Sequence, residues 1–402
     1  MHSTERTFSI SKWARQIVPG IITAAIVFGP SKITITSKMG ASYGYDLLWA
    51  VAAAILFMIV YTGMAARIAQ ATEVSVLTTI RRRWGGWASL TVGAGIFLVT
   101  TSFQAGNAIG TGIAVAEMTH TPADWWVVIF TALALSLLFF RAFYRILEKL
   151  MIALVVLMLL AFCVTLVVIR PDPDNILAGF IPGFPKGSTG LVIAFTASCF
   201  SLVAAFYQAY LVQEQKKRGP VSSGGAVPGI LLLGVLVLIV MMCAGTALHS
   251  QGIAVDSAMD MARALEPLFG PYAAYLFLAG LFGASISSLV GNATVGGTML
   301  ADALYNESGL ESPKVRGLIA FIMTAGAAIA IVFGQIPLQA IVIAQSVTIF
   351  IVPVIGISLL LLANDKAIMG ASANNFLQNA LGITGLAILI VLAILNVRQL
   401  FF

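Results

Sequence analysis

Charged residues are scarce in this sequence. Only 9% of its 402 residues are Asp, Glu, Lys or Arg, and 59% are hydrophobic, whereas soluble domains are about 25% charged. This deficit excludes a soluble protein and indicates an integral membrane protein in which helices carry nearly all the mass. At roughly 20 residues per crossing, the length allows about ten to twelve membrane spans.

Cysteine and the motifs of enzymes are also largely missing. The three cysteines, Cys163, Cys199 and Cys243, lie in apolar segments without metal-ligand spacing, and they indicate no disulfide framework. We find no phosphate-binding loop, no nucleophile with its base and no zinc-protease motif, so we expect neither an enzyme nor a bound cofactor. The glycine-rich stretch 106–112 lies inside an apolar segment and indicates close helix packing instead.

Eleven apolar segments account for most of the chain and predict an all-α membrane protein with a single transmembrane domain, 1–402. Residues 1–16 are polar and basic, which predicts a cytoplasmic segment and not a cleavable signal peptide. The predicted spans are 17–37, 45–68, 88–115, 124–141, 149–169, 190–212, 227–248, 271–299, 315–334, 338–362 and 378–397.

The distribution of positive charge predicts the orientation of these spans. With the N-terminus inside, sixteen of the 22 Lys and Arg residues fall on the inner side, five fall outside, and Lys32 lies in the membrane. Cytoplasmic loops carry such an excess of Lys and Arg. We therefore expect a cytoplasmic N-terminus, an external C-terminus and location in a bacterial inner membrane. The net charge of +6 needs no nucleic acid partner to explain it.

No acidic residue and no histidine lies at the middle of a predicted span. Hard divalent cations take oxygen ligands that usually include a carboxylate, and transition metals prefer His, Cys or Asp/Glu. The sequence therefore predicts no conventional metal site and favours a cargo other than a bare divalent cation.

The first predicted span is interrupted at mid-depth by Gly29, Pro30, Ser31 and Lys32. Proline cannot continue a helix that precedes it, and broken backbone inside a membrane is tolerated only beside protein or a water-filled cavity. An ionisable side chain at this depth costs at least about 2.5 kcal/mol. The combination is typical of the binding centre of a secondary transporter.

Several segments in collinear order resemble the Nramp family of proton-coupled divalent-metal transporters. The first span matches the family's proline-glycine start and Asp-Pro-Gly-Asn break, and the next begins as the family's second helix does. The segments that carry the resemblance read PGIITAAIVFGPSKI, GYDLLWAV, AARIAQAT, AIGTGIAV, YLVQEQ, GASISSLVGNATVGGTML, IAQSVTIFIVP and ANDKAIMG.

The residues that hold metal in that family are replaced here. Gly29 stands at the family's metal-binding Asp and Lys32 at its Asn, while Pro30 is kept. The Met-Pro-His of the sixth helix falls on Ser201, Leu202 and Val203, its later histidine on Gln208, and the acid of the third helix on Asn107. Metal binding and proton coupling through those positions are not expected.

The resemblance implies the Nramp and amino-acid-transporter type of fold, with 5+5 inverted repeats and broken helices 1 and 6. The first repeat corresponds to 17–169, the second to 190–362, and an extra helix to 378–397. A break in the sixth span is expected between Thr196 and Ser201, where small and polar residues follow one another.

Lys32 has three interpretations. Its ammonium binds an anionic group of the substrate beside the positive end of a half-helix, it takes the place of a coupling ion or proton carrier, or it pairs with backbone carbonyls. Other polar residues are candidates for the substrate site or the transport path: Ser198, Ser201 and Gln208 in the sixth span, Gln104 and Asn107 in the third, and Gln345 and Thr348 in the tenth.

We therefore predict an Nramp-related secondary active transporter that works by alternating access. Its site lies at the break that contains Gly29, Pro30, Ser31 and Lys32, and a small organic anion or amino acid is favoured as substrate, with a proton or another ion as coupling partner. The alternatives are a divalent metal ion transporter, as is typical of Nramp proteins, and a transport-inactive sensor or channel-like protein.

Overall fold

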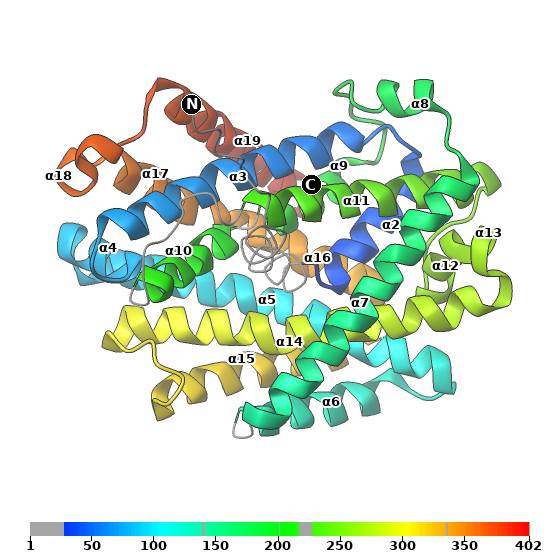
Figure 1. Ribbon diagram of the computed structural model, residues 1–402, viewed down its shortest axis with the longest axis horizontal. Coiled ribbons are helices and arrows are strands. Elements are labelled where there is room, and N and C mark those ends of the chain that lie inside the picture. Colours follow the sequence, from blue (N-terminus) through cyan, green and yellow to red (C-terminus); the bar gives the residue numbers. More distant parts are fainter. Residues whose placement is uncertain (1–27, 139–140, 201, 217–226, 335–336, 402) are drawn as a thin grey trace, which may run out of the picture.

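The computed structural model describes residues 28–138, 141–200, 202–216, 227–334 and 337–401. All regular structure in these ranges is helical (Figure 1). The helices before residue 217 are α2 Pro30–Tyr43, α3 Leu48–Ala71, α4 Val76–Trp84, α5 Gly86–Thr119, α6 Ala123–Leu137, α7 Arg141–Ile169, α8 Pro173–Ala178, α9 Thr189–Cys199 and α10 Leu202–Lys216.

The remaining elements follow from residue 227 onward. They are α11 Val227–Ala247, η1 His249–Gln251, α12 Ala258–Ala262, η2 Arg263–Leu265, α13 Glu266–Phe269, η3 Gly270–Tyr272, α14 Ala273–Tyr305, α15 Pro313–Val332, α16 Pro337–Val347, η4 Thr348–Phe350, α17 Val352–Asn364, α18 Lys366–Met369, η5 Gly370–Ser372 and α19 Phe376–Phe401.

Each of the eleven predicted spans overlaps one or two of these helices. By length and composition, eight helical segments of the described chain can cross a membrane, or nine if the bent pair α16–α17 forms one span. The 15-residue α6 is shorter than a full crossing, and the first half of the predicted first span lies outside the described residues. The all-helical membrane fold is as predicted, whereas the number eleven remains a prediction.

Helix α2 begins at Pro30, within the predicted first span. In the sixth span α9 ends at Cys199 and α10 begins at Leu202, and by length and composition Thr189–Lys216 counts as one membrane-spanning segment. A bend of 42° between α16 with η4 and α17 differs from the uninterrupted tenth span that the sequence predicts. Pro353 explains it, because a proline in the first turn of α17 has no N–H to continue the preceding helix.

Helix α14 packs along α5 and α15 and forms the most extensive helix contact of the fold. Glycines permit the close approach: a Cβ on Gly296 would overlap the Thr100 hydroxyl, and one on Gly297 would lie 2.7 Å from the Ile319 nitrogen. Helix α10 instead packs against α3. The chain therefore contains a tight block of α5, α14 and α15, beside which α3 and α10 lie.

Short helices lie at two opposite ends of the molecule. In Figure 1, α4 is at the left end, and α8, α12 and α13 are at the right end. Helix α4 carries Arg81, Arg82 and Arg83 in its last turn, and Lys216 closes α10 beside it. We call this the basic end; it is the end that the charge distribution predicts to be cytoplasmic.

Candidate functional site

Helix α2 starts in the interior of the molecule. Gly29 has extended backbone angles, φ −85° and ψ 176°, and its carbonyl accepts the first bonds of the helix, from the N–H groups of Lys32 and Ile33 at 3.1 and 3.4 Å. Pro30 occupies the first turn, where a missing N–H costs nothing because that group has no partner in a helix. The local sequence thus places a helix N-terminus, and not a continuous helix, at this depth.

Glycines bring this N-terminus against two neighbouring helices. A Cβ on Gly29 would lie 2.8 Å from the Ser288 Oγ of α14, and a Cβ on Gly106 of α5 would lie 2.6 Å from the Ser31 Oγ. Both distances are far below an ordinary contact. A carboxylate at position 29 would therefore require Ser288 to move.

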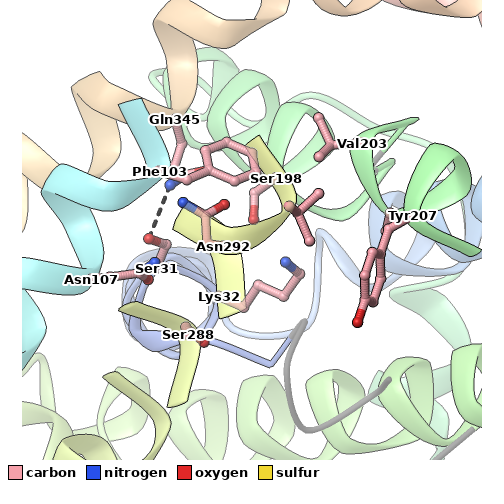
Figure 2. A pocket seen from close by; sticks show the side chains of 13 residues that line it. Ser31, Lys32, Phe103, Asn107, Ser198, Val203, Tyr207, Ser288, Asn292 and Gln345 are labelled. Carbon is pink, nitrogen blue, oxygen red and sulfur yellow. Dashed lines mark hydrogen bonds between the residues drawn. The ribbon is translucent and has the colours of Figure 1, made fainter. Parts of the chain in front are cut away.

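A hollow of about 70 Å³ opens at the start of α2 (Figure 2). Six helices line it, namely α2, α5, α9, α10, α14 and α16. The lining residues are Gly29, Ser31, Lys32, Phe103, Asn107, Ser198, Val203, Ala204, Tyr207, Ser288, Asn292, Val295 and Gln345.

Gln345 joins α16 to α2 across this hollow. Its Nε2 donates to the Ser31 Oγ at 2.9 Å, the bond drawn in Figure 2. The side chain is 1% exposed, and its Oε1 accepts no hydrogen bond from the described part of the chain. The carbonyl of Gln345 accepts a local bond from the Thr348 hydroxyl at 2.7 Å, and Thr348 does not line the hollow.

A set of amides joins α5 to α14 beside the hollow. The Gln104 Nε2 donates to the Leu289 carbonyl at 2.7 Å, and the Asn292 Nδ2 donates to the Thr100 carbonyl at 2.7 Å and to the Gln104 Oε1 at 3.0 Å. Gln104 is therefore committed to holding the two helices together. Asn107 and Asn292 line the hollow and present their amides to its edge.

Lys32 is 6% exposed and lines the hollow, into which its side chain extends in Figure 2. Within the described ranges it forms no salt bridge and no side-chain hydrogen bond. A buried charge without a partner costs several kcal/mol, and such residues inside membranes mark functional sites by default. Lys32 is the only cation among the residues that line this hollow.

The predicted site residues are only partly brought together. Gly29, Ser31, Lys32, Asn107, Ser198 and Gln345 line the hollow. Pro30, Gln104, Gln208 and Thr348 are buried nearby but do not line it, and Ser201 lies outside the described residues. Pro30 packs against α5 at Gly110.

The prediction omitted Ser288 and Asn292 of α14. Asn292 lies in the run of small residues GASISSLVGNATVGGTML, and such a run is also typical of tight helix packing. The i, i+4 spacing of the two residues places them on one face of the helix, and that spacing is the signal that could have identified them. The aromatic rings of Tyr207 and Phe103 also line the hollow. Their positions in the sequence give no comparable sign of this.

The hollow contains uncharged oxygen atoms that can serve as ligands of a metal ion. They are the hydroxyls of Ser31, Ser198 and Ser288, the amide oxygens of Asn107, Asn292 and Gln345, and the backbone near Gly29. No group of three or more His, Cys, Asp or Glu side chains that could hold a metal ion occurs in the part of the chain that the structure describes.

Comparison with known proteins places this architecture among transporters. The sequence profile of the family described as natural resistance-associated macrophage protein-like, Nramp, matches residues 20–399. A divalent metal cation transporter MntH of Deinococcus radiodurans is 25% identical over 94% of this chain and 87% of its own length. A second, from Chromohalobacter salexigens, is 26% identical over 97% of this chain and 91% of its own length.

Solved structures agree on the fold. A manganese transporter of Eremococcus coleocola, in complex with an aromatic bis-isothiourea compound, has a TM-score of 0.75 at 18% identity and covers 99% of this chain and 89% of its own. A nucleobase-cation-symport-1 family transporter in a closed conformation has a TM-score of 0.62 at 13% identity, with 94% and 92% covered.

These findings contradict the expectation of a small organic anion or amino acid as cargo, because the full-length relatives are named for divalent metal cations. That expectation gave decisive weight to Lys32 and to the missing carboxylates. Hard cations also accept amide and backbone carbonyl oxygens and water as ligands, and the hollow contains such oxygens.

Proposed function

Because the chain belongs to the Nramp family of multi-pass membrane transporters, we propose that it is a secondary transporter of a divalent metal cation. The cation binds in the hollow at the start of α2 and crosses by alternating access. The names of the relatives over nearly the whole chain support the class of cargo.

The free Oε1 of Gln345 is the observation that carries the proposal. A buried amide oxygen without a hydrogen bond costs free energy, and this one belongs to a residue that lines the hollow. A cation beside it would satisfy the oxygen. The Nε2 of the same side chain is already held by Ser31, so the oxygen is oriented before the cation arrives.

The other ligands we propose are Ser31, Ser198, Asn107, Asn292 and water. Carbonyl and water oxygens suit manganese, magnesium and calcium, and a hollow of about 70 Å³ has room for an ion with a few water molecules. With neutral ligands only, the site gives less electrostatic stabilisation than a site built of carboxylates. We therefore expect a low-affinity site for hard divalent cations.

Lys32 opposes this cargo electrostatically. A divalent cation and an ammonium in one hollow repel each other, and the low dielectric of the interior strengthens the repulsion. We propose that Lys32 lowers the affinity for the cation so that the cation leaves the site readily. We include a proton as the coupling ion in this proposal.

We propose that the basic end faces the cytoplasm of a bacterial cell and that the protein lies in the inner membrane. The excess of Lys and Arg on the predicted inner side supports this orientation.

Uptake of manganese into proteoliposomes tests the function. The purified protein should accumulate Mn²⁺ above protein-free liposomes, with saturation. Gln345→Leu removes the free oxygen and should reduce kcat/KM by about tenfold or more, since losing a hydrogen-bonding partner in a buried site costs about 1–3 kcal/mol.

Gln251→Leu is the matched control, because this glutamine bonds only to the nearby Ala247 carbonyl and lies outside the hollow. It should leave uptake unchanged. Absence of saturable uptake of manganese, magnesium and calcium by the parent protein would refute the proposal.

A further inference from the structure

Helix α10 is fastened to the end of α3 by a series of contacts at the basic end. The Gln213 side chain donates to the Val74 carbonyl. The Lys216 ammonium bonds to the Gln70 and Thr72 carbonyls at 3.1 and 3.2 Å and to the Glu73 carboxylate at 2.8 Å. Helix α10 and the link from α3 to α4 therefore form one unit.

Helix α14 belongs to the other unit. Along its length it packs into α5 and α15 at Gly296 and Gly297, where no side chain would fit. Relative motion of α14 against α5 and α15 would open gaps in a close-packed contact, so these helices are expected to move together.

A buried carboxylate of α14 contacts α10 and the link from α3 to α4, close to the bond that the Arg81 guanidinium of α4 donates to the Ala303 carbonyl. Asp302, in the last turn of α14, is 4% exposed. Its Oδ2 accepts from the Ser75 hydroxyl at 2.6 Å and from the Tyr210 hydroxyl, and its Oδ1 lies 3.5 Å from the Thr78 hydroxyl. It forms no salt bridge with any described residue. Hydroxyls of α10, of the link from α3 to α4 and of the start of α4 therefore hold this charge of α14.

The contact between Tyr210 and Asp302 lies between the hollow at the start of α2 and the basic end. A second hollow, of about 520 Å³, lies between α10 and α14 and shares Tyr207 and Val295 with the first. Tyr210 lines this second hollow and also a third one, which opens at Arg81 and Arg82. The three hollows follow α10 from Lys32 to the basic end, and the Tyr210–Asp302 bond lies beside this route.

We propose that Asp302 is a positioning residue for transport: through Tyr210 and Ser75 it holds α10 against α14 and keeps the route to the basic end narrow. Opening at this end requires the Tyr210–Asp302 bond to break so that α10 separates from the α5–α14–α15 block. The inference rests on the alternating access of the proposed function, but not on the identity of the cargo.

Cysteine labelling tests the proposal without any metal. Val295→Cys reports on the junction of the first two hollows, and the parent chain with its three native cysteines gives the background. A membrane-impermeant maleimide is added to vesicles of known orientation. Asp302→Asn and Tyr210→Phe should each raise the labelling rate from the basic end by about tenfold, because each weakens a hydrogen bond to a charged group.

Tyr45→Phe is the matched control. It also removes a phenolic hydroxyl that bonds another helix, here to Thr246 at 2.5 Å, but on the side of the molecule away from α4. It should leave labelling from the basic end unchanged. Asp302→Glu keeps the charge and should return the rate toward that of the parent.

A merely structural role gives a different result: the melting temperature falls while the labelling rate stays at the parent value, and this overturns the proposal. If Asp302→Asn does not fold, Tyr210→Phe, which removes a single oxygen atom, decides alone. A parent protein that transports no divalent cation would refute the proposed function and leave the labelling result standing.

Discussion

Lys32 is the residue at which the sequence and the relatives of this protein disagree most. The relatives are named for divalent cations, yet an ammonium lines the hollow where such a cation would bind. If the hollow holds a cation, removing this charge must strengthen binding, whereas an anion site would be weakened by the same change.

Lys32→Met should therefore raise the affinity for Mn²⁺. An ammonium and a divalent cation about 6 Å apart repel by roughly 5–6 kcal/mol at an effective dielectric of about 20. Since the water that replaces the ammonium leaves only part of this as a gain, we expect a decrease in Kd of about tenfold or more. Isothermal titration of the purified protein measures it.

Lys32→Arg retains the positive charge and serves as the control, with no gain in affinity expected. Weaker binding of Mn²⁺ by the methionine variant would contradict the assigned role of Lys32.

Individual residues of the candidate site could be predicted only where their residue type is unusual within an apolar span. Pro30 and Lys32 are conspicuous because proline and lysine are unusual within an apolar span, and Gln345 because it is polar in one. Ser288 and Asn292 are not unusual in this sense, since small and polar residues on α14 also serve helix packing. Their position at the hollow depends on the approach of α2 to α14 at Gly29, which is a tertiary contact that no local pattern contains.

At the scale of helices, the close packing of α5 against α14 determines which parts of the protein can move. Gly296 is central to this contact, because any Cβ there would overlap Thr100 and would approach Ile322. The contact depends on the absence of a side chain more than on any specific bond.

Gly296→Ala should destabilise the protein by about 1–3 kcal/mol, the usual effect of overpacking a filled interior. Thermal unfolding in detergent, followed by tryptophan fluorescence, measures the change.

Gly317→Ala is the matched control, because no atom lies within 4 Å of its added Cβ and the residue is within α15. Alanine is the better helix former there, so this variant should be as stable as the parent or more stable. Equal melting temperatures for the two variants would show that the α5–α14 contact is not close-packed in solution.

The interruptions of helices were predictable to different degrees. A proline within an apolar segment predicted the start of α2, whereas the break expected between Thr196 and Ser201 stays a prediction, because Thr189–Lys216 counts as one membrane-spanning segment. The bend before α17 has the same kind of signal in Pro353, which lies well inside the predicted span 338–362, but the prediction for that span is an uninterrupted helix.

At the scale of the whole molecule, composition and the spacing of apolar segments predicted the all-helical fold. They did so because a membrane requires every backbone group to be satisfied within helices. Cargo could not be obtained in this way, since it depends on a few oxygen atoms within a hollow and not on the pattern of the chain.

The orientation of the molecule is a prediction at this scale. A tag at the N-terminus should be accessible only from the cytoplasm and a tag after Phe402 only from outside, because of the bias of Lys and Arg toward the predicted inner loops. Proteolysis of the tags in spheroplasts measures both. Cleavage of the C-terminal tag only after lysis would contradict an odd number of spans.

We expect the buried Lys32 to make transport sensitive to voltage. With the alternating access proposed above and with this lysine protonated, the carrier without cargo holds a positive charge within the membrane, and each change of access moves that charge between the two sides of the field. Each elementary charge that crosses 100 mV changes the free energy by about 2.3 kcal/mol. An inside-negative potential therefore drives the loaded carrier inward but opposes the outward return of the empty one. We expect manganese uptake, measured at potassium diffusion potentials, to pass through a maximum as the potential becomes more negative, and Lys32→Met to abolish that maximum.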